Sequence, residues 1–383
     1  MIEKFSPKDF IKPADICGCG FKHDYPLEAV LFGALEECLE LIEDYGVEPP
    51  YGVLYDEITY EVAGRRVLEH LGGKGFVVSM PTYREANLRL EEVRKAGVRT
   101  IVAVGGGMVI DVARYVAYEG GYEFVAIPTA PSNDGIASPR SALYHESATG
   151  ELVYTGTSPA KPPRIVIFDI SIISSAPRKL ISSGYADVLA KLVSIKDWQL
   201  ARDDVNEPYC KNAEELTMMA VDMLIDVVKK GGFISPEDIM VLCKALILPG
   251  AAMGIVGSTR PAGGSEHMVA RHIEIHFKRK IPHGIAVAFG TLAMGMLHQL
   301  RNPNWWKDEK YFVNAMRRYL KVWEVPTRLE EINISEELMI EAITEEWKQR
   351  PERYTILHKI KPDRELAREI ILKSGLISRR AIS

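Results

Sequence analysis

The feature that most constrains the fold is an alternation that begins near residue 50. Apolar runs of strand length recur at 51–55 (YGVLY), 75–80 (GFVVSM), 100–105 (TIVAVG), 124–129 (FVAIPT) and 164–168 (RIVIF). Segments with helical spacing separate the first four runs, at 57–71, 83–96 and 109–119. Unbroken apolar strands that alternate with amphipathic helices are typical of a parallel sheet covered on both faces. The first half is therefore predicted to be an open, Rossmann-like α/β domain.

The second half has a different pattern, because strand-length runs stop after Ser175. Helical spacing is found at 178–200, 212–230, 235–248, 284–300, 306–322, 335–349 and 363–374. We expect an α/β domain over 1–175 and a mainly α-helical domain over 176–383, with the active site in the cleft between them. Before the sheet, an amphipathic helix is predicted at about 27–45. Within the Ser-, Gly- and Pro-rich stretch 130–163, a hairpin is predicted between Leu143 and Thr155.

Composition narrows the classes of function. The chain has 383 residues, of which 47% are apolar and 26% charged, as in ordinary soluble globular proteins. The net charge of −5 and the lack of a Lys/Arg block argue against nucleic-acid binding. A small anionic substrate needs only a few local basic groups and stays compatible. The apolar stretch 285–297 is shorter than the roughly 20 residues of a membrane span, so no membrane insertion is expected.

The cysteines and the N-terminus point to a cytoplasmic protein. Five scattered cysteines do not suggest a disulfide framework and fit a reducing compartment. The first ten residues, MIEKFSPKDF, lack the apolar core of a signal peptide. Cys17-Gly-Cys19 has the form of half a metal site, but no second cysteine pair lies near it in the sequence. A metal site is therefore disfavoured there, and no function is assigned to the irregular segment ahead of the 27–45 helix.

A glycine-rich turn is the first candidate binding element. The run at 100–105 ends in Gly105-Gly106-Gly107-Met108-Val109-Ile110-Asp111, and a helix follows at once. Glycines let the backbone approach a ligand, and the N–H groups of a helix start suit a pyrophosphate. The Rossmann fingerprint is incomplete, since Ile110 stands where its third glycine would be. A tight strand-to-helix turn is the alternative, but the position favours nucleotide binding.

Two further strand ends carry polar residues. The run at 124–129 leads into TAPSNDGIASP (129–139), whose hydroxyl and carboxylate groups suit a sugar-phosphate or a hydroxylated substrate. Ordinary turn chemistry explains Asp-Gly and Ser-Pro equally well. Asp56 ends the first run, where an acid can bind a ribose diol and disfavour a 2′-phosphate. That position would favour NAD over NADP.

Histidines gather in SEHMVARHIEIHFKRKIPHG (265–284), which holds four of the nine in the chain. His272 and His276 share one helix face and are explained by a charged amphipathic helix. Such a helix does not explain His267 and His283, and His283 is fixed between Pro282 and Gly284. The stretch does not have the HExxH pattern of metalloproteases. A metal site is one interpretation, with its third ligand from elsewhere in the chain.

A resemblance adds to this interpretation. GGGxxxD (105–111), PTxxSxDGxxSP (128–139), Gly-Tyr-Ala-Asp187, Gly-Ser-Glu-His267-Met and Pro-His283-Gly occur in the order found in sn-glycerol-1-phosphate dehydrogenases. The chain resembles that family over roughly residues 50–300. The family belongs to a superfamily with glycerol dehydrogenase, iron-containing alcohol dehydrogenases and dehydroquinate synthase. Asp134-Gly-Ile-Ala-Ser-Pro139 and Arg260–Met268 are the segments specific to the phosphate-using branch.

The resemblance implies a function and a site. It implies a homo-oligomeric enzyme that uses NAD(H) or NADP(H) to reduce dihydroxyacetone phosphate to sn-glycerol 1-phosphate, the backbone of archaeal membrane lipids. Asp187, His267 and His283 would bind a catalytic zinc ion, and Asp134 would contact the phosphorylated substrate. The implied cofactor contacts are Gly105, Gly106, Gly107, Met108, Val109, Ile110, Asp111, Thr129, Ser132 and Ser138, to which the strand-end argument adds Asp56.

One departure from the family bears on the substrate. Four residues after His267 the family usually has a histidine, where this chain has Arg271. An arginine there would grip a substrate phosphate with its fork of donors, or indicate another polyol phosphate. The alternatives are a dehydrogenase for unphosphorylated polyols, a lyase of the dehydroquinate synthase type and a nucleotide-binding regulator. The lyase would need several anion contacts, for which Lys161, Arg140 and Arg260 are candidates.

Overall fold

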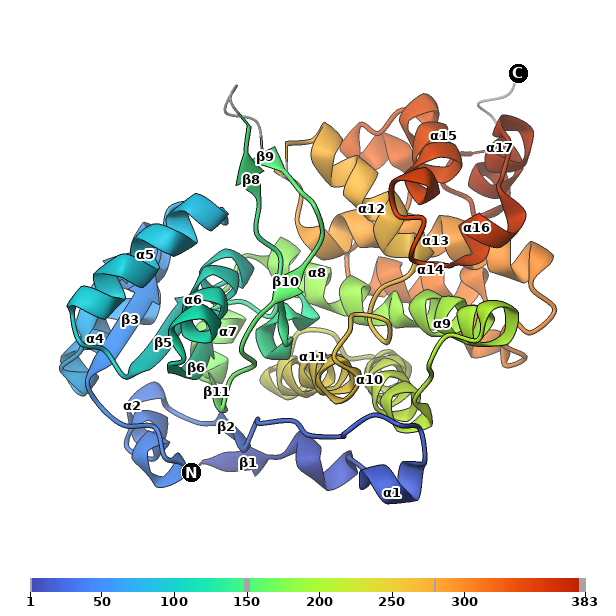
Figure 1. The fold of residues 1–383 in the computed structure, drawn as a ribbon. Helices are drawn as coiled ribbons and strands as arrows, with labels where there is room; N and C mark the ends of the chain where they lie inside the picture. The colour runs from blue at the N-terminus through green and yellow to red at the C-terminus, as the bar shows by residue number, and fades with distance from the viewer. Residues whose placement is uncertain (1, 148–151, 279, 379–383) are drawn as a thin grey trace.

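The structure is a computed structural model that describes residues 2–147, 152–278 and 280–378. Its first half forms a seven-stranded sheet, and its second half is helical (Figure 1). Across the sheet the strands follow the order β1 (Glu3–Phe5), β2 (Ala29–Phe32), β11 (Ile165–Phe168), β6 (Glu123–Pro128), β5 (Thr100–Gly105), β3 (Tyr51–Tyr55) and β4 (Lys74–Val77). Only β1 and β2 pair antiparallel; every other neighbouring pair in this sheet is parallel. The five predicted strands are all present, and the predicted fold class is confirmed.

Both faces of the sheet are buried in its centre, which explains why the inner strands are apolar at most positions, whereas the edge strands β1 and β4 also carry exposed polar residues. Ile101 and Ala103 of β5 join one hydrophobic cluster, and Val102 and Val104 join another. This alternation follows from the two-residue period of a strand. The covering helices are α2 (Leu35–Leu39), α4 (Arg65–Leu71), α5 (Tyr83–Lys95), α6 (Gly107–Gly120) and α7 (Ile170–Ser174), with a short α3 (Glu57–Thr59) and a π-helical turn (Tyr60–Gly64) before α4.

The helical half is built around α13, which packs against α8, α12 and α14. Its helices are α8 (Arg178–Leu189), α9 (Lys191–Val205), α10 (Lys211–Lys229), α11 (Pro236–Val256), α12 (Ser265–His276), α13 (His283–Arg301), α14 (Val313–Val322), α15 (Glu336–Glu345), α16 (Ile356–Ile360) and α17 (Arg364–Lys373). The predicted helix 306–322 begins late, at Val313, after a 3₁₀ turn over Glu309–Tyr311. Residues 346–349 of the predicted helix 335–349 form a 3₁₀ turn.

Helix α11 is longer than its sequence predicts. We expected it to end at residue 248, before Pro249, but it continues through that proline to Val256. Among the described residues it is the one helix long and apolar enough to cross a membrane. However, 78% of its most apolar window is buried inside the protein, against α10 and the first half. That burial is typical of the core helix of a globular protein.

The prediction of a helix over 27–45 was wrong. Ala29–Phe32 forms β2, which pairs parallel with β11 and antiparallel with β1. Only α2 and a 3₁₀ turn over Ile42–Tyr45 are helical in this region. All four β2 residues are buried, and periodicity alone does not distinguish a short buried strand from a buried helical turn. The segment ahead of β2 is an extended strap with a short α1 (Ala14–Cys17), which runs beneath α10 and α11 (Figure 1).

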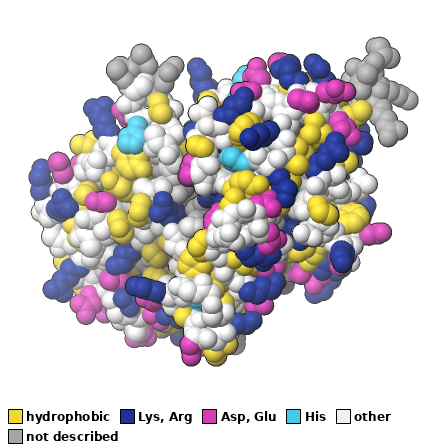
Figure 2. Space-filling model, turned by 45° about the vertical axis from the view of Figure 1, so that its right-hand side comes forward, with side chains coloured by type: hydrophobic (Ala, Val, Ile, Leu, Met, Phe, Trp, Pro, Cys, Tyr) yellow, Lys and Arg dark blue, Asp and Glu magenta, His cyan; other side chains and the backbone are white. Residues whose placement is uncertain are grey.

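The predicted hairpin is present between the two halves. β8 (His145–Glu146) pairs antiparallel with β9 (Leu152–Val153), and its tip, 148–151, lies outside the described residues. Below it, β7 (Arg140–Ser141) pairs with β10 (Ser158–Pro159). Basic and acidic side chains are interspersed over the face of the molecule in Figure 2. The hairpin and the β6–β7 connection form one wall of the space between the halves (Figure 1).

Candidate active site and metal centre

Three side chains with metal-ligand chemistry meet where the helical half faces the sheet. They are Asp187 on α8, His267 on α12 and His283, the first residue of α13. Nε2 of His267 lies 3.6 Å, and Nε2 of His283 4.0 Å, from Oδ1 of Asp187. One ligand atom from each residue lies within 4.8 Å of the other two. The structure thus brings together the three residues that the family resemblance selected, although 96 residues separate the first from the last.

Two glycines of α13 make this convergence possible. A Cβ atom added to Gly284 would lie 1.8 Å from the carbonyl oxygen of Ser183 on α8. One added to Gly290 would lie 2.1 Å from the carbonyl oxygen of Glu266 on α12. Backbones in such close contact exclude any side chain larger than hydrogen. The glycines therefore let α13 lie directly against both neighbours, which places His283 beside Asp187 and His267.

Each histidine is oriented by a carboxylate. Nδ1 of His267 is 2.7 Å from Oε1 of Glu266, and Nδ1 of His283 is 2.7 Å from Oε1 of Glu274. If each Nδ1 donates its proton to that carboxylate, each Nε2 presents a lone pair toward Asp187. Metal-binding histidines are held in this way in proteins, because the outer carboxylate fixes the ring and raises its basicity. The donor set of one carboxylate and two imidazoles fits zinc, with open positions for a ligand.

Lys191 adds a positive charge next to the carboxyl group of Asp187. Its Nζ lies 2.8 Å from Oδ1 of Asp187 and 2.8 Å from Oδ2 of Asp134, and its side chain is fully buried. Burial disfavours an ionised Asp187, but Lys191 and the two imidazoles outweigh that cost and hold the pKa of Asp187 below its ordinary value. Sequence analysis missed Lys191. Its spacing of four residues from Asp187, an ion-pair spacing in helices, was the available signal.

Neighbouring carboxylates also change the pKa values of the two histidines. Burial alone would lower the pKa of His267, but its contacts with Asp187 and Glu266 raise that pKa to about 9. For His283, burial is likewise outweighed, chiefly by Glu274, and its pKa is raised. A metal ion that binds here replaces these protons as the positive charge facing Asp187.

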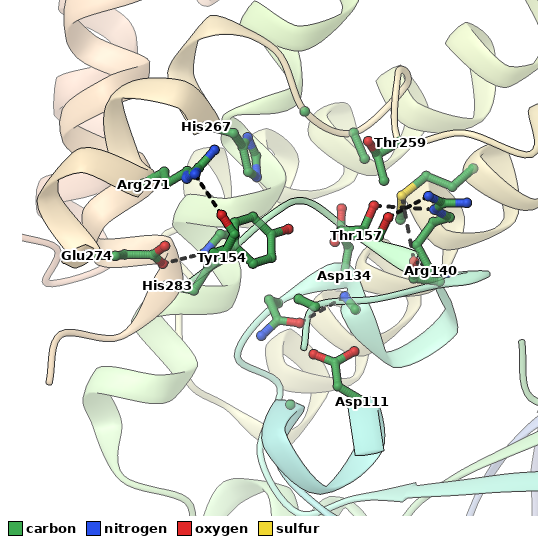
Figure 3. A pocket seen from close by; sticks show the side chains of 18 of the residues that line it. Asp111, Asp134, Arg140, Tyr154, Thr157, Thr259, His267, Arg271, Glu274 and His283 are labelled. Atoms are coloured by element: carbon green, nitrogen blue, oxygen red, sulfur yellow. Dashed lines mark hydrogen bonds and ion pairs between the residues drawn. The ribbon is translucent and has the colours of Figure 1, made fainter. Parts of the chain in front are cut away.

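A cavity of about 340 Å³ is lined by His267 and His283 (Figure 3). Both halves of the chain line it, as expected for an active site in an interdomain cleft. The predicted site residues along its wall are Gly107, Met108, Asp111, Asp134, Ser138, His267, Arg271 and His283. Asp187 is fully buried behind the two histidines.

The glycine-rich turn opens toward this cavity. β5 ends at Gly105, Gly106 caps α6, and α6 begins at Gly107. A Cβ atom on Gly106 would meet nothing within 4 Å, so the backbone there is accessible to a ligand. The side chains of Val109 and Ile110 point into the hydrophobic core. Of the predicted residues 105–111, Met108 and Asp111 are therefore the two whose side chains line the cavity.

The other predicted cofactor contacts lie at the same edge of the sheet, but their polar atoms are partly used. Ser138 Oγ accepts a hydrogen bond from the backbone N–H of Arg140. Asp56 caps α3, where its Oδ1 accepts from the N–H of Thr59 at 2.8 Å. Thr129 is buried, and Ser132 contacts Asn133 through its hydroxyl. Asp56, Thr129 and Ser132 are not on the cavity wall.

Four arginines line the cavity: Arg140, Arg271, Arg350 and Arg353. Nη2 of Arg271 donates to the carbonyl oxygen of Tyr154 at 2.9 Å, while its buried Nε has no hydrogen-bond partner among the described residues. A buried donor without a partner is costly unless a ligand satisfies it. Arg350 and Arg353 were missed, because they follow a 3₁₀ turn far from every recognised motif.

Two other basic residues that sequence analysis offered as anion contacts have different roles. Lys161 Nζ donates to the carbonyl oxygen of Tyr122 at 2.6 Å and pairs with Glu123. Arg260 pairs with Glu207 and donates to the carbonyl oxygen of Tyr354. Neither lies on the cavity wall. Of the three candidates, only Arg140 lines the cavity.

A buried arginine supports the turn that carries Asp134. Arg114 on α6 is fully buried and donates to the carbonyl oxygens of Gly135, Ser138 and Arg140. It therefore ties the helix of the glycine-rich turn to the 3₁₀ turn Asp134–Ala137. In the same turn, the N–H of Asp134 donates to Oδ2 of Asp187 at 2.8 Å. The two predicted loops and the metal-ligand group are thus one connected structure.

Solved structures with a similar fold include a glycerol dehydrogenase and a reductase. The fold matches a probable glycerol dehydrogenase from Sinorhizobium meliloti with a TM-score of 0.70 and 19% identity, covering 90% of this chain and 94% of that one. It matches a maleylacetate reductase from a Rhizobium species with a TM-score of 0.71 and 14% identity, covering 92% and 97%. The sequence profile of the iron-containing alcohol dehydrogenase family matches residues 30–177. The fold is the one found in these oxidoreductases.

More similar relatives define the branch. Glycerol-1-phosphate dehydrogenase (NAD(P)+) of Sulfurisphaera tokodaii is 35% identical over 350 residues, which cover 90% of this chain and 95% of that protein. The enzyme of the same name from Pyrococcus horikoshii is 33% identical over 363 residues, which cover 92% and 99%. The chain belongs to the glycerol-1-phosphate dehydrogenase family.

Proposed function

We propose that the chain catalyses the NAD(P)H-dependent reduction of dihydroxyacetone phosphate to sn-glycerol 1-phosphate, assisted by a zinc ion. The observation that carries this proposal is a single cavity that joins a glycine-rich helix start, a group of arginines and the Asp187, His267 and His283 cluster. A phosphorylated ketone and a nicotinamide cofactor need these three features within reach of each other. The names of the relatives support the same activity.

The substrate phosphate is assigned to the arginines. Arg271 has a buried, unpartnered Nε, and Arg140, Arg350 and Arg353 surround the same space. Guanidinium groups bind phosphate through paired, charge-assisted hydrogen bonds, which a neutral polyol would not satisfy. This arrangement favours a phosphorylated substrate over an unphosphorylated one. It also gives Arg271, at the position of the usual family histidine, a function of its own.

The cofactor is assigned to the opposite wall. The half-buried backbone at Gly106 and Gly107, at the start of the 14-residue helix α6, suits a pyrophosphate. Asp111 lies one turn into α6 on the cavity wall. Oδ1 of Asp56 already accepts a hydrogen bond from Thr59, so a ribose would have to share this carboxylate with the cap of α3. The choice between NAD and NADP therefore stays open, and we infer only a nicotinamide dinucleotide.

Asp187, His267 and His283 would hold the zinc ion, which when bound acts as a Lewis acid toward the carbonyl oxygen that gains negative charge during hydride transfer. Glu266 and Glu274 keep both histidine Nε2 atoms directed at this point. Lys191 offsets part of the negative charge of the neighbouring carboxyl groups of Asp134 and Asp187. Asp134, on the cavity wall, is placed to accept a hydrogen bond from a hydroxyl of the substrate. The surrounding walls limit the access of water to the transferred hydride.

Steady turnover tests the proposal. The purified protein with zinc, NADH or NADPH and dihydroxyacetone phosphate should oxidise the reduced cofactor continuously. Dihydroxyacetone in place of dihydroxyacetone phosphate, or glycerol with NAD+ or NADP+ in place of glycerol 1-phosphate, should react far more slowly. Equal rates with unphosphorylated substrates would contradict the phosphate assignment. A lyase of the dehydroquinate synthase type would return the hydride within each cycle and give no net consumption of NADH, which would overturn the proposal. Homo-oligomerisation and a cytoplasmic location stay predictions.

A further inference from the structure

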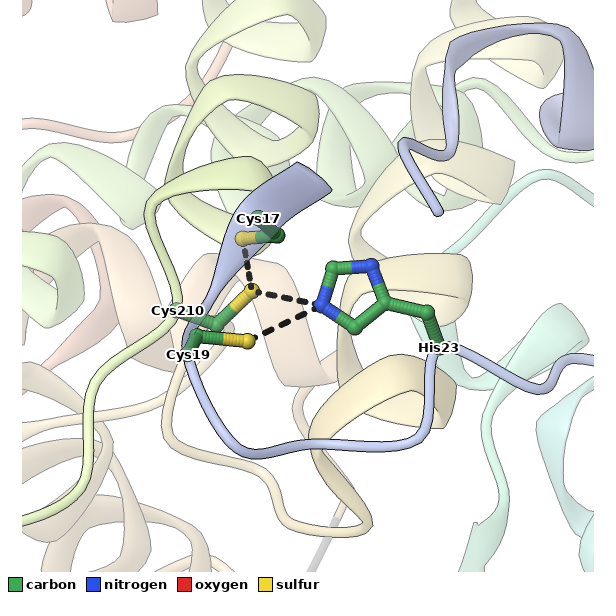
Figure 4. A group of neighbouring side chains, drawn as sticks. All are labelled: Cys17, Cys19, His23 and Cys210. Carbon is green, nitrogen blue, oxygen red and sulfur yellow. Dashed lines mark hydrogen bonds between the residues drawn. The ribbon is translucent and has the colours of Figure 1, made fainter. Parts of the chain in front are cut away.

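A second group of metal-type ligands lies outside the active site. Cys17, Cys19 and His23 from the N-terminal strap face Cys210 at the start of α10 (Figure 4). One ligand atom from each of the four lies within 4.8 Å of the others. Among the described residues, this group and the active-site cluster are the two that could hold a metal ion. A site at Cys17 and Cys19 was disfavoured from the sequence because no second cysteine pair lies near them. In the structure the remaining ligands are a histidine and a distant cysteine.

The distances approach those of a tetrahedral site. Sγ of Cys17 lies 3.8 Å from Sγ of Cys210, which lies 3.4 Å from Nε2 of His23. Sγ of Cys19 lies 3.0 Å from the same nitrogen. Zinc bonds of 2.3 Å to sulfur and about 2.1 Å to nitrogen place tetrahedral ligand atoms about 3.6–3.8 Å apart. Small adjustments of the side chains would therefore suffice.

The residues around the four ligands orient them for a metal ion. Nδ1 of His23 lies 2.6 Å from the carbonyl oxygen of Lys12, so a proton on Nδ1 is donated there and Nε2 faces the sulfurs. That backbone carbonyl is a usual outer partner of a metal-bound histidine. Cys210 is the N-cap of α10, and its sulfur accepts a hydrogen bond from the N–H of Ala213.

The local backbone also serves this arrangement. Gly18 and Gly20 have φ values of +63° and +82°, which turn the strap so that Cys17, Cys19 and His23 face one point. Two hydrogen bonds hold the strap to α10 beside the cluster: the N–H of Lys12 donates to Asn212 Oδ1, and Asn212 Nδ2 donates to the carbonyl oxygen of Phe10. The four ligands therefore come from two segments that are already docked together.

We propose that Cys17, Cys19, His23 and Cys210 form a second, structural zinc site that fastens the N-terminal strap to the helical half. Three thiolates and one imidazole fill all four positions of a tetrahedral zinc ion and leave none for a substrate. The site also lies outside the residues that line the active-site cavity. A zinc ion there stabilises the protein by joining residues 17–23 to residue 210, and takes no part in hydride transfer.

Cobalt substitution tests this site separately from the active site. Only the proposed site offers sulfur ligands, so the cobalt form of the whole protein, prepared under reducing conditions, should show sulfur-to-cobalt charge-transfer absorption. The variant His267→Ala should keep that band, and Cys19→Ser and His23→Gln should weaken or shift it. Cys38→Ala is the matched control, because Cys38 is a buried cysteine away from the cluster. A cobalt protein without the sulfur band would overturn the proposal.

Zinc stoichiometry gives a second, independent measurement on the unmodified protein. Protein supplied with zinc should hold about two ions per chain, and a thiol-specific mercurial should release one of them. Cys19→Ser should lose that releasable ion, whereas His267→Ala should retain it. A disulfide between Cys17 and Cys210 in protein kept under reducing conditions, or no zinc released by the mercurial, would overturn the proposal. Either outcome leaves the activity with dihydroxyacetone phosphate as a separate question.

Discussion

The two ligand clusters of this protein differ in chemistry and in surroundings. Asp187, His267 and His283 offer oxygen and nitrogen from three helices of one half, and they face a cavity. Cys17, Cys19, His23 and Cys210 offer sulfur and nitrogen from a surface strap and a helix start, and they face one another. Zinc sites in proteins divide along this line, since catalytic sites keep an open position and structural sites are closed. If both proposed sites bind zinc, the comparison suggests separate functions for them, reaction at one and attachment at the other.

The largest expected difference between the clusters is in turnover. Asp187→Asn keeps the shape of the side chain but removes the charge that faces the metal. We expect kcat/KM to fall by at least about 10³-fold, since several kcal/mol of charge stabilisation are lost. Cys19→Ser should change kcat by less than about twofold. Steady-state kinetics at saturating zinc, with a thermal melt of each variant, checks both. Equal losses in the two variants would abolish the proposed division of function.

The second expected difference is in pH dependence. In the metal-free protein the pKa of His267 is raised to about 9, because Asp187 and Glu266 outweigh burial. Below that pH, zinc must displace a proton, so its affinity for the active site should rise with pH and level off above about 9. The slope should be at least about tenfold per pH unit. Competition with a chelator of known affinity, in Cys19→Ser to isolate this site, measures it. A flat profile between pH 7 and 8 would contradict the pKa assignment.

The third difference concerns the anion contacts of the open site. Arg271→Ala should lower kcat/KM for dihydroxyacetone phosphate by about 10- to 100-fold, the value of one or two charge-assisted hydrogen bonds. Arg271→Lys should recover part of the lost kcat/KM. Arg84→Ala, which removes an exposed arginine paired with Glu146, is the control and should behave like the unmodified protein. If Arg271→Ala weakened NADH binding instead, as seen in fluorescence titration, the phosphate of the cofactor would be the partner of Arg271.

A fourth, smaller effect would show how strongly the outer carboxylates Glu266 and Glu274 affect zinc binding at the active site. Glu274→Gln removes the charge beside Nδ1 of His283 and should weaken zinc binding at the active site by about tenfold. The number of zinc ions released by the mercurial should not change. Isothermal titration of the metal-free protein measures the affinity. An unchanged affinity would mean that the carboxylate only positions the ring in the metal-free state.

The smallest effect on activity should accompany a clear effect on stability. Cys19→Ser should lower the melting temperature by several degrees, since 1 kcal/mol corresponds to about 2–4 °C in proteins somewhat smaller than this one. Cys38→Ala serves as the control for the loss of a thiol. Calorimetry with and without added zinc separates the contribution of the ion from that of the side chain. A variant as stable as the parent in both conditions would argue against a structural metal.

The sequence predicted most of the sheet and the helical half, and it did so through periodicity. The run 101–104 was predicted to be a strand buried on both faces. Both its length and the glycines that follow it indicated a strand. Ala29–Phe32 is equally apolar and is followed by Gly33, but this run of four residues is too short to be distinguished by its pattern from a turn of the helix that follows. Its partner β11 lies more than a hundred residues away, and local patterns do not contain that information.

The site was predictable only in part, for a related reason. Motifs singled out Asp134, His267 and His283, because their neighbours in the sequence are unusual. Lys191 and Arg353 sit in ordinary helical or turn sequences, and only the packing of distant segments makes them part of the cavity region. Cys210 was likewise visible in the sequence without any indication of its neighbours. Apart from the four-residue spacing between Asp187 and Lys191, these residues carry no local signal, because they act through tertiary contact.

The pairing of β1 with β2 has a practical consequence. β1 covers the outer edge of the seven-stranded sheet, and the strap that follows it returns to the sheet as β2. A shortened protein that begins after the strap would expose the unpaired backbone groups of β2 along a fully apolar strand. Open strand edges of this kind pair with other molecules and lead to aggregation. Expression of this enzyme therefore depends on keeping its first residues, even though they lie far from the chemistry.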